Sequence, residues 1–336
     1  MKRPFGPILP VTIAIFCVSC SSGTPGSSPF PAISGDLSAV VAGFSLSPEG
    51  SNAYVPPTDA ERETYRSALS NLLDGDTESA LEGLESLGME IVDFTDVTGP
   101  TFILIRENQS PLRGWGLYAI NTSALRNLLL EAPHPGADLG TETQAAGLFL
   151  DVSARGLLIA GTHRCASPDA SPCTGTTSVC SASSADEPFR VSDTAHDAGQ
   201  IFQITHEVLL NSDFSLKAVA LHGFEREEGD PHAFVSNGTD KPFNAEALAN
   251  RFAARLNEIT SLTDAARSCN DAGSSARLCG THDVQGRYAN GSADACTGEA
   301  PGATGRFLHV EQSLDLRTGG GEVDPSSVRL VLEEFF

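Results

Sequence analysis

From about residue 90 onward, short apolar runs alternate with segments of helical periodicity, and this alternation restricts the chain to an α/β fold. The runs at residues 156–161 and 217–221 are almost continuously apolar, which is typical of strands buried on both faces of a largely parallel sheet. We therefore predict a three-layer α/β/α sandwich with a mixed, largely parallel central sheet. The other runs expected to be strands lie at residues 90–94, 101–105, 116–120 and 307–311.

The N-terminal residues have the features of an export signal. A positively charged start precedes a mainly apolar stretch at residues 8–18, which is too short for a comfortable membrane span. Residues 17–20 resemble a bacterial lipobox with Cys20 as the lipidated residue, although Cys17 stands where lipoboxes usually carry Leu. Acyl chains on Cys20 would anchor the protein to a membrane face without spanning it. Ordinary secretion with cleavage nearby is the alternative.

The rest of the chain divides by composition. Residues 21–55 are rich in Ser, Gly and Pro and are expected to form a flexible tether. Residues 56–336 are expected to form a single α/β domain that begins with a helical hairpin at residues 56–88.

Net charge and cysteine usage limit the partners and the compartment. A formal charge of −22 argues against nucleic-acid binding and against attraction to anionic lipid, so the lipid anchor is the only membrane contact expected. The cysteines beyond the signal number six, an even count that indicates three disulfides in an exported protein. Their spacing favours one pair within residues 165–180, one within 269–296, and a third that is bridging or local.

A loop after the leucines at 128–130 carries the first candidate site residues. The leucine run is either a buried strand or the end of a helix, and the loop opens with residues that break regular structure. His134, Asp138 and Glu142 lie on this loop and on the helical pattern that follows Thr141. One imidazole and two carboxylates can supply part of a zinc shell. A polar loop with a Thr141 helix cap is the simpler interpretation.

Two further polar residues occur at the ends of strand-like runs. His222 follows the run at 217–221, and Glu311 ends the run at 307–311. Ligands of open α/β sheets collect beyond the carboxyl ends of the strands. We therefore expect His134, His222 and a carboxylate from Asp138 or Glu142 to bind a metal, with Glu311 as general base and acid.

These residues resemble the motifs of a known family. Residues 132–141 are similar to the first zinc motif of poly-γ-glutamate hydrolases, which are bacterial and phage relatives of the zinc carboxypeptidases. Residues 220–224 resemble their second ligand strand, and residues 308–312 resemble the late strand that carries the catalytic Glu in zinc carboxypeptidases.

The resemblance implies a carboxypeptidase-like fold and a Zn²⁺ cofactor. It makes His134, Asp138 and His222 the zinc ligands and Glu311 the catalytic base. Zinc carboxypeptidases space their first pair of ligands as His-x-x-Glu, whereas this chain has His-x-x-x-Asp, so Glu142 remains an alternative third ligand.

Substrate-binding residues are less constrained by sequence. Arg164, which follows a core strand, and Arg287 are candidates to hold a substrate carboxylate as a bidentate pair. His196 is a candidate substrate contact. Four histidines compete with the proposed ligands for a metal, namely His163, His196, His206 and His309, and His309 shares a strand face with Glu311.

The favoured function is zinc-dependent hydrolysis of an amide bond at the cell envelope. The substrate would be a peptide, a γ-glutamyl chain or an N-acyl amino acid, and the protein would be exported and lipid-anchored. The first alternative is a catalytically inactive metal-binding or surface-binding domain on the same fold. A second is hydrolysis of ester or phosphate bonds at the same centre.

Overall fold

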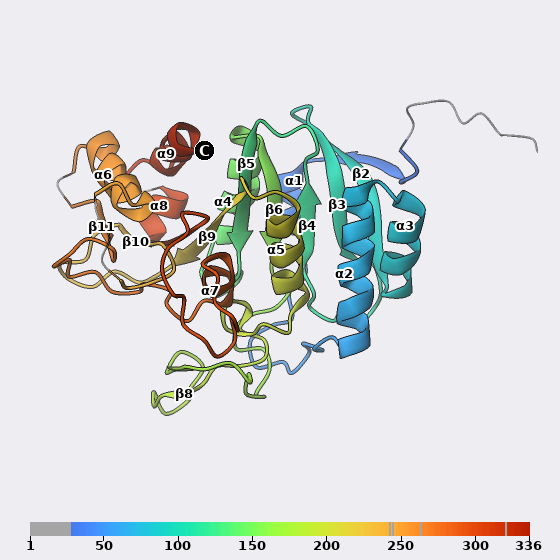
Figure 1. The fold of residues 1–336 in the computed structure, drawn as a ribbon, viewed down its shortest axis with the longest axis horizontal. Coiled ribbons are helices and arrows are strands. Elements are labelled where there is room, and N and C mark those ends of the chain that lie inside the picture. The colour runs from blue at the N-terminus through green and yellow to red at the C-terminus, as the bar shows by residue number, and fades with distance from the viewer. Residues whose placement is uncertain (1–27, 242, 244, 263, 320) are drawn as a thin grey trace, which may run out of the picture.

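The computed structural model describes residues 28–336, except residues 242, 244, 263 and 320. The strands of its main sheet are β1 (Ala32–Gly35), β2 (Met89–Asp96), β3 (Thr101–Glu107), β4 (Leu117–Ile120), β5 (Arg126–Ala132), β6 (Ala154–Ile159), β9 (Lys217–Gly223), β10 (Ala233–Ser236), β11 (Ala266–Ser268) and β12 (Phe307–Gln312). In the described residues they form one ten-stranded sheet in the order β1-β2-β3-β4-β6-β5-β9-β12-β10-β11 (Figure 1). Strands β6, β5, β9 and β12 are parallel to one another and form the middle of the sheet.

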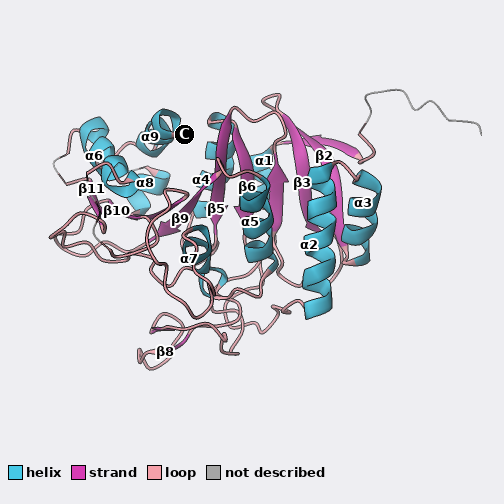
Figure 2. Cartoon of the chain, viewed as in Figure 1, coloured by secondary structure: helices cyan, strands magenta, loops and turns pink. Residues whose placement is uncertain are grey.

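The helices pack on the sheet in two groups, each with its own cluster of buried apolar residues (Figure 2). One group is α1 (Leu37–Ala42), α4 (Thr141–Asp151), α6 (Leu248–Thr260), α8 (Leu314–Thr318) and α9 (Ser326–Phe335). The other is α2 (Asp59–Asp74), α3 (Thr77–Ser86), α5 (Ile201–Ser212) and α7 (Val284–Ala289). In Figure 1, α2, α5 and α7 lie in front of the sheet. The chain is therefore an α/β protein with a mixed sheet.

The middle strands are apolar along their length because both of their faces are covered. Leu128, Leu129 and Leu130 are fully buried and belong to β5, so this leucine run is a strand and not the end of a helix. Leu128 and Leu130 contribute to the first apolar cluster and Leu129 to the second, as the alternation of side chains along a strand requires.

Two helices occupy the region expected to hold a helical hairpin. Helix α2 begins with a capping box in which Thr58 and Glu61 bond each other's backbone N–H groups. It ends at Gly75, which adopts the left-handed conformation that glycine tolerates best. Asp76 then caps α3, so the turn between the two helices is fixed by local chemistry.

The N-terminal part of the described chain differs from the tether expected for residues 21–55. Strand β1 pairs in parallel with β2, and helix α1 follows it directly. Leu37 and Val41 are buried against the sheet, and the Leu37 N–H donates to Asp96 at 2.8 Å. Folding of residues 32–42 is favoured because it buries these side chains and extends the sheet edge. The expected signal peptide and Cys20 lie outside the described residues.

The described residues contain three disulfides, as the number of cysteines beyond the expected signal predicts. Cys165–Cys180 and Cys269–Cys279 close local loops, and Cys173–Cys296 bridges segments that are 123 residues apart. Disulfides of this kind indicate that the protein folds in an oxidising compartment, as exported proteins do.

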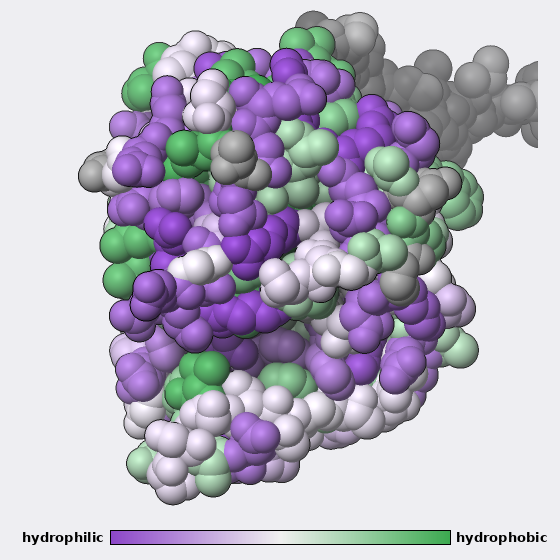
Figure 3. Space-filling view, turned by 90° about the vertical axis from the view of Figure 1, so that its left-hand side faces the viewer, coloured by the Kyte–Doolittle hydropathy of each residue, from purple (hydrophilic) through white to green (hydrophobic). Residues whose placement is uncertain are grey.

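The surface view at the β11 end of the sheet shows mainly hydrophilic residues, with apolar ones scattered among them (Figure 3). A polar surface with a strong net negative charge favours solubility. Within the described residues, no helix combines the length and the apolar character needed to cross a membrane.

Candidate metal centre

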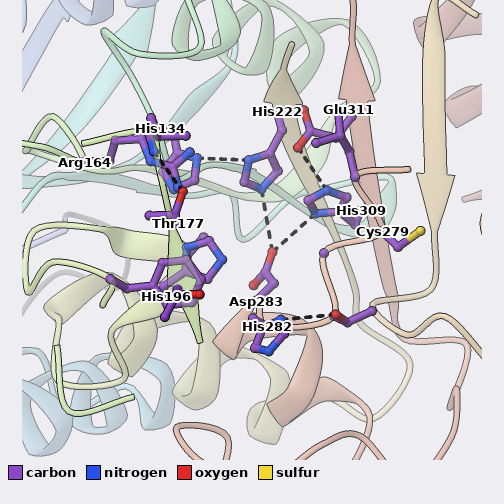
Figure 4. Close-up of a pocket in the computed structure, with 17 residues that line it drawn as sticks. His134, Arg164, Thr177, His196, His222, Cys279, His282, Asp283, His309 and Glu311 are labelled. Carbon is purple, nitrogen blue, oxygen red and sulfur yellow. Dashed lines mark hydrogen bonds and ion pairs between the residues drawn. The ribbon is translucent and has the colours of Figure 1, made fainter. Parts of the chain in front are cut away.

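The chain places its candidate ligands beyond the carboxyl ends of adjacent parallel strands. His134 follows β5, His222 lies near the end of β9, and Glu311 lies near the end of β12. His222 and Glu311 are direct neighbours in the parallel pairing of β9 with β12. These residues line one cavity of about 300 Å³, at the low end of the range for small-ligand sites (Figure 4).

Three ligand atoms form a small triangle at this cavity. His134 Nδ1 lies 3.2 Å from His222 Nδ1, and Asp138 Oδ2 lies 3.3 Å from each of these two nitrogens. In a tetrahedral zinc site with bonds of about 2.0–2.1 Å, neighbouring ligand atoms are about 3.3 Å apart. The triangle therefore suits a divalent metal ion in size and donor type.

A single tight turn explains how His134 and Asp138 come together. The N–H groups of Ala137 and Asp138 both donate to the carbonyl of His134, at 3.2 and 2.9 Å. The carbonyl of Asp138 then accepts from the Thr141 N–H and hydroxyl at the start of α4. Because the turn brings residues four apart onto one side, the His-x-x-x-Asp spacing suits joint metal binding.

The structure brings Asp138, and not Glu142, into the triangle. Asp138 converges with His134 and His222, whereas Glu142 lies in the first turn of α4 and belongs to no such group of ligand atoms in the described residues. Arg317 stabilises this loop, since its Nε donates to the Leu139 carbonyl at 2.9 Å and its Nη1 donates to the carbonyl of Gln312. This arginine ties the ligand loop to the end of β12.

A buried carboxylate contacts the edge of the His134 ring opposite Nδ1. The sequence patterns did not indicate this carboxylate as a site residue. His134 Nε2 lies 2.8 Å from Asp193 Oδ1, and Asp193 is fully buried. With its Nε2–H donated to Asp193, His134 keeps its Nδ1 lone pair for the metal, as metal-binding histidines commonly do.

Asp193 also accepts from Arg164 and His196. Arg164 donates from Nε at 3.1 Å and from Nη2 at 2.7 Å to Oδ2, and His196 Nδ1 lies 2.8 Å from Oδ1. Burial works against a charged Asp193, but Arg164, His196 and His134 outweigh it and hold the pKa of this carboxyl well below its ordinary value. The contacts of 2.8 Å from Asp193 to the two imidazoles are hydrogen-bond distances, shorter than the separation of two ligands on one metal.

Charge in the triangle favours a bound cation. Burial disfavours an ionised Asp138, yet the imidazoles of His134 and His222, each 3.3 Å from its Oδ2, hold the pKa of this carboxyl well below its ordinary value. Burial also disfavours a charged His222, but Asp138 and Asp283 raise the pKa of His222 to about 10 in the metal-free protein. The carboxylates of Asp138 and Asp283 therefore favour a positive charge between them. In the metal-free protein the proton on His222 supplies it, and a divalent metal can replace that proton.

Glu311 has a carboxylate oxygen available for chemistry. Its Oε1 lies 3.4 Å from His309 Nε2, and its buried Oε2 has no hydrogen-bond partner within the described part of the chain. The side chain lines the cavity beside His222 (Figure 4). A carboxylate at the wall of a cavity can accept a proton from water.

The proposed substrate residues fall in two places. Arg164 and His196 line the cavity, and the His196 ring stacks on Phe189 with 3.7 Å between ring centroids. Arg287 does not line it. Arg287 is almost fully buried in α7, where it donates to the carbonyl of Thr281 and to the Cys296 carbonyl, at 3.0 and 3.2 Å. The Arg287 guanidinium therefore stabilises the loops that contain Thr281 and Cys296 and does not face the cavity.

The remaining histidines differ in their surroundings. His206 lies on α5, packed against β5, where its Nδ1 is 2.6 Å from Glu131 Oε1, and both side chains are fully buried. His163 Nδ1 accepts from the Cys165 N–H at 3.1 Å. His309, in contrast, lines the cavity and lies close to both Asp283 and Glu311.

Asp193 and Asp283 are the two site residues that the sequence patterns did not reveal. Both precede short helical segments, where an Asp is ordinarily explained as a cap. The neighbouring His196 was the only local signal for Asp193, and Asp283 stands next to His282. Only the packing of distant loops shows that these carboxylates face imidazoles.

The fold and this cluster define the protein as an α/β protein with a His/Asp centre suited to a divalent metal. No protein-family model and no curated protein sequence matches the chain. Among solved structures it is similar to a bacteriophage poly-γ-glutamate hydrolase, with 12% identity and a TM-score of 0.34 over 65% of this chain and 86% of that one. It is also similar to a candidate carboxypeptidase from Burkholderia mallei, with 12% identity and a TM-score of 0.32 over 76% of this chain and 65% of that one. These likenesses are too remote to transfer a function.

Proposed function

We propose that this protein is a zinc-dependent hydrolase that cleaves amide bonds in a peptide, a γ-glutamyl chain or an N-acyl amino acid. One observation supports this above all others. His134 Nδ1, Asp138 Oδ2 and His222 Nδ1 form a metal-sized triangle, and its two histidines line a cavity together with Glu311. Three protein ligands with an open fourth position are typical of catalytic zinc, whereas structural zinc sites use four.

The roles of the side chains follow from this geometry. When bound, zinc supplies a Lewis acid that polarises a substrate carbonyl and brings the pKa of water toward about 7. Glu311 accepts a proton from the attacking water at its unpartnered Oε2 and then donates that proton to the leaving nitrogen. Asp193 fixes the ring of His134, so that Nδ1 stays directed at the metal position.

Arg164 and His196 are suited to bind the substrate. Asp193 occupies Nε and Nη2 of Arg164, while Nη1 has no hydrogen-bond partner among the described residues. Burial lowers the pKa of His196 below its ordinary value, so this ring is neutral and can accept a hydrogen bond at Nε2. Together they offer one cationic donor and one acceptor at the cavity wall, which suits a carboxylate beside an amide N–H.

We also propose that the fold has the three-layer arrangement of a carboxypeptidase and that the protein is anchored to the membrane by lipid. Helices with separate apolar clusters on the sheet support the layered arrangement. The three disulfides support export, and the lipobox-like residues 17–20 support anchoring through Cys20 at the cell envelope.

The decisive experiment compares Glu311→Gln with the wild-type protein on a panel of γ-glutamyl oligomers, peptides and N-acyl amino acids. We expect the wild type to release amines from one of these classes. In Glu311→Gln, kcat should fall by about 10²–10⁴, because the amide cannot accept the proton. The zinc content should stay unchanged, because Glu311 is not a member of the triangle.

Glu142→Gln is the matched control, since it also neutralises a carboxylate near the ligand loop but belongs to no group of converging ligand atoms in the described residues. It should retain turnover. A wild-type protein that binds zinc and cleaves no member of the panel would instead support the alternative, a metal-binding or surface-binding domain without catalysis.

A further inference from the structure

A second ligand triangle lies on the other side of the His222 ring. His222 Nε2 is 3.6 Å from Asp283 Oδ2, and His309 Nδ1 is 3.5 Å from the same oxygen. The three atoms lie within 4.8 Å of one another. Figure 4 shows the carboxylate of Asp283 directed at both imidazoles. Their donors, two nitrogens and one carboxylate oxygen, are those of the first triangle.

None of these three atoms has a hydrogen-bond partner in the described structure, although all are buried. Their separations of 3.5 and 3.6 Å are too long for hydrogen bonds but close to the spacing of about 3.3 Å between ligands on a tetrahedral metal. Leaving one buried polar atom without a partner costs about 1–3 kcal/mol, and here three such atoms converge. A common partner for all three would remove this cost.

Neighbouring segments hold the second triangle in place. Asp283 caps helix α7, and its Oδ1 accepts from the N–H groups of Gln285 and Gly286, which leaves Oδ2 free to face the rings. A Cβ added to Gly280 would lie 2.6 to 2.9 Å from three atoms of the His309 ring. A point nearly equidistant from these ring atoms lies over the face of the ring. Gly280 therefore packs on that face and leaves the in-plane Nδ1 unobstructed.

We propose that His222 Nε2, Asp283 Oδ2 and His309 Nδ1 form a second metal site, which shares the His222 ring with the first. A nitrogen and carboxylate donor set suits zinc or a similar divalent transition metal. A neutral imidazole has one free lone pair. Filling both sites at once therefore converts His222 to an imidazolate, and its remaining N–H proton passes to solvent.

The competing explanation is that Asp283 only orients His222, as carboxylates behind metal-binding histidines often do. Asp193 provides a reference for that role within the same protein, because it lies at 2.8 Å from His134 Nε2. Asp283 lies 0.8 Å farther from His222 Nε2, at 3.6 Å, and faces a second imidazole at a similar distance. The geometry around Asp283 is that of a ligand set, whereas the geometry around Asp193 is that of a hydrogen bond.

Metal stoichiometry tests the proposal independently of turnover. The full-length protein is stripped with a chelator, dialysed against zinc and analysed by elemental mass spectrometry. We expect about two zinc ions per wild-type chain and about one in His309→Gln and in Asp283→Asn. His134→Gln should also retain about one, while His222→Gln should lose both. Replacement with Co²⁺ should give two separable sets of absorption bands in the wild type and one in His309→Gln.

His282→Gln is the matched control, since His282 lines the same cavity and belongs to neither triangle, so it should retain about two ions. Circular dichroism melting curves identify any variant that has failed to fold. Asp283→Asn alters a helix cap, so if this variant does not fold, His309→Gln tests the second site in its place. A single zinc ion in the wild type that is lost in His134→Gln and kept in His309→Gln would overturn the second site while leaving the first intact. Two ions without turnover would contradict the proposed function but not the second site.

Discussion

The buried carboxylate of Asp193 lies 2.8 Å from His134 Nε2, while His134 Nδ1, on the opposite side of the ring, faces Asp138 and the proposed metal position. This contact links the ligand to Arg164 and His196 through one carboxyl group. Its geometry predicts that Asp193 sets the tautomer of His134 without binding the metal itself.

Replacing Asp193 with Asn should therefore weaken zinc binding without removing a ligand. We expect a 10- to 100-fold loss of zinc affinity, the range that supporting residues of metal ligands usually show. Competition with a chromophoric chelator measures the change. Asp138→Asn, which alters a ligand, should lose more affinity than Asp193→Asn, and the reverse order would contradict the assignment of the two carboxylates.

Asp138 and Glu142 can be separated in the same assay. Asp138→Asn should abolish stoichiometric zinc binding at the first site, because a neutral amide is a poor metal ligand in a buried pocket. Glu142→Gln should bind zinc as the wild type does, since Glu142 lies outside the triangle. Loss of zinc in Glu142→Gln alone would make Glu142 the third ligand.

Zinc affinity should rise with pH. In the metal-free protein His222 has a pKa of about 10, so below that pH a proton must leave before Nδ1 can bind a metal. The apparent affinity at the first site should increase about tenfold per pH unit between about pH 6 and pH 8, as a titration in non-coordinating buffers would show. A pH-independent affinity over this range would mean that His222 is not a ligand.

Asp197 should limit stability at neutral pH. Burial raises the pKa of Asp197 to about 6 from an ordinary value of 3.8, so the folded state holds this proton more tightly than the unfolded state. The wild type should then lose about 2–3 kcal/mol of unfolding free energy relative to Asp197→Asn as pH rises from about 4 to about 6. The Asn variant retains an acceptor for the Gly199 N–H, which lies 2.8 Å from Oδ1.

Urea unfolding of both proteins at several pH values measures this difference. The difference should be near zero below about pH 3, where Asp197 is protonated in both states, and constant above about pH 7. If Asp197→Asn is less stable than the wild type at neutral pH, the prediction is wrong, because neighbouring groups then stabilise the ionised carboxylate by more than its burial costs.

Gly280 should not tolerate a side chain. Its φ is +59°, and an added Cβ would lie 2.6 Å from His309 Nδ1. Gly280→Ala should therefore cost about 2–4 kcal/mol, from backbone strain and from displacement of the His309 ring. Gly273 is a matched control, because its φ is +84° and a Cβ there meets nothing within 4 Å. Gly273→Ala should cost only the backbone strain, about 1–2 kcal/mol. Equal losses in the two variants would show that the His309 ring moves freely.

Much of the fold could be predicted because it follows from local pattern. Continuous apolar runs become the buried middle strands, and the capping box at Thr58 with the left-handed Gly75 fixes the ends of α2. The expected ligands lie at the carboxyl ends of parallel strands, where the alternation of strands and helices puts them. The edge strand β1 was missed because four residues in a Ser, Gly and Pro-rich segment carry almost no periodic signal.

The sequence by itself determined the α/β class, the number of disulfides and the order of the candidate ligands, because each depends on residue type and spacing along the chain. Only the tertiary structure decided the pairing of Cys173 with Cys296, the preference for Asp138 over Glu142, and the burial of Arg287 away from the cavity. It also brought Asp193 and Asp283 to the two faces of the site. Distances between side chains on different loops depend on how those loops pack, and no local pattern records that packing.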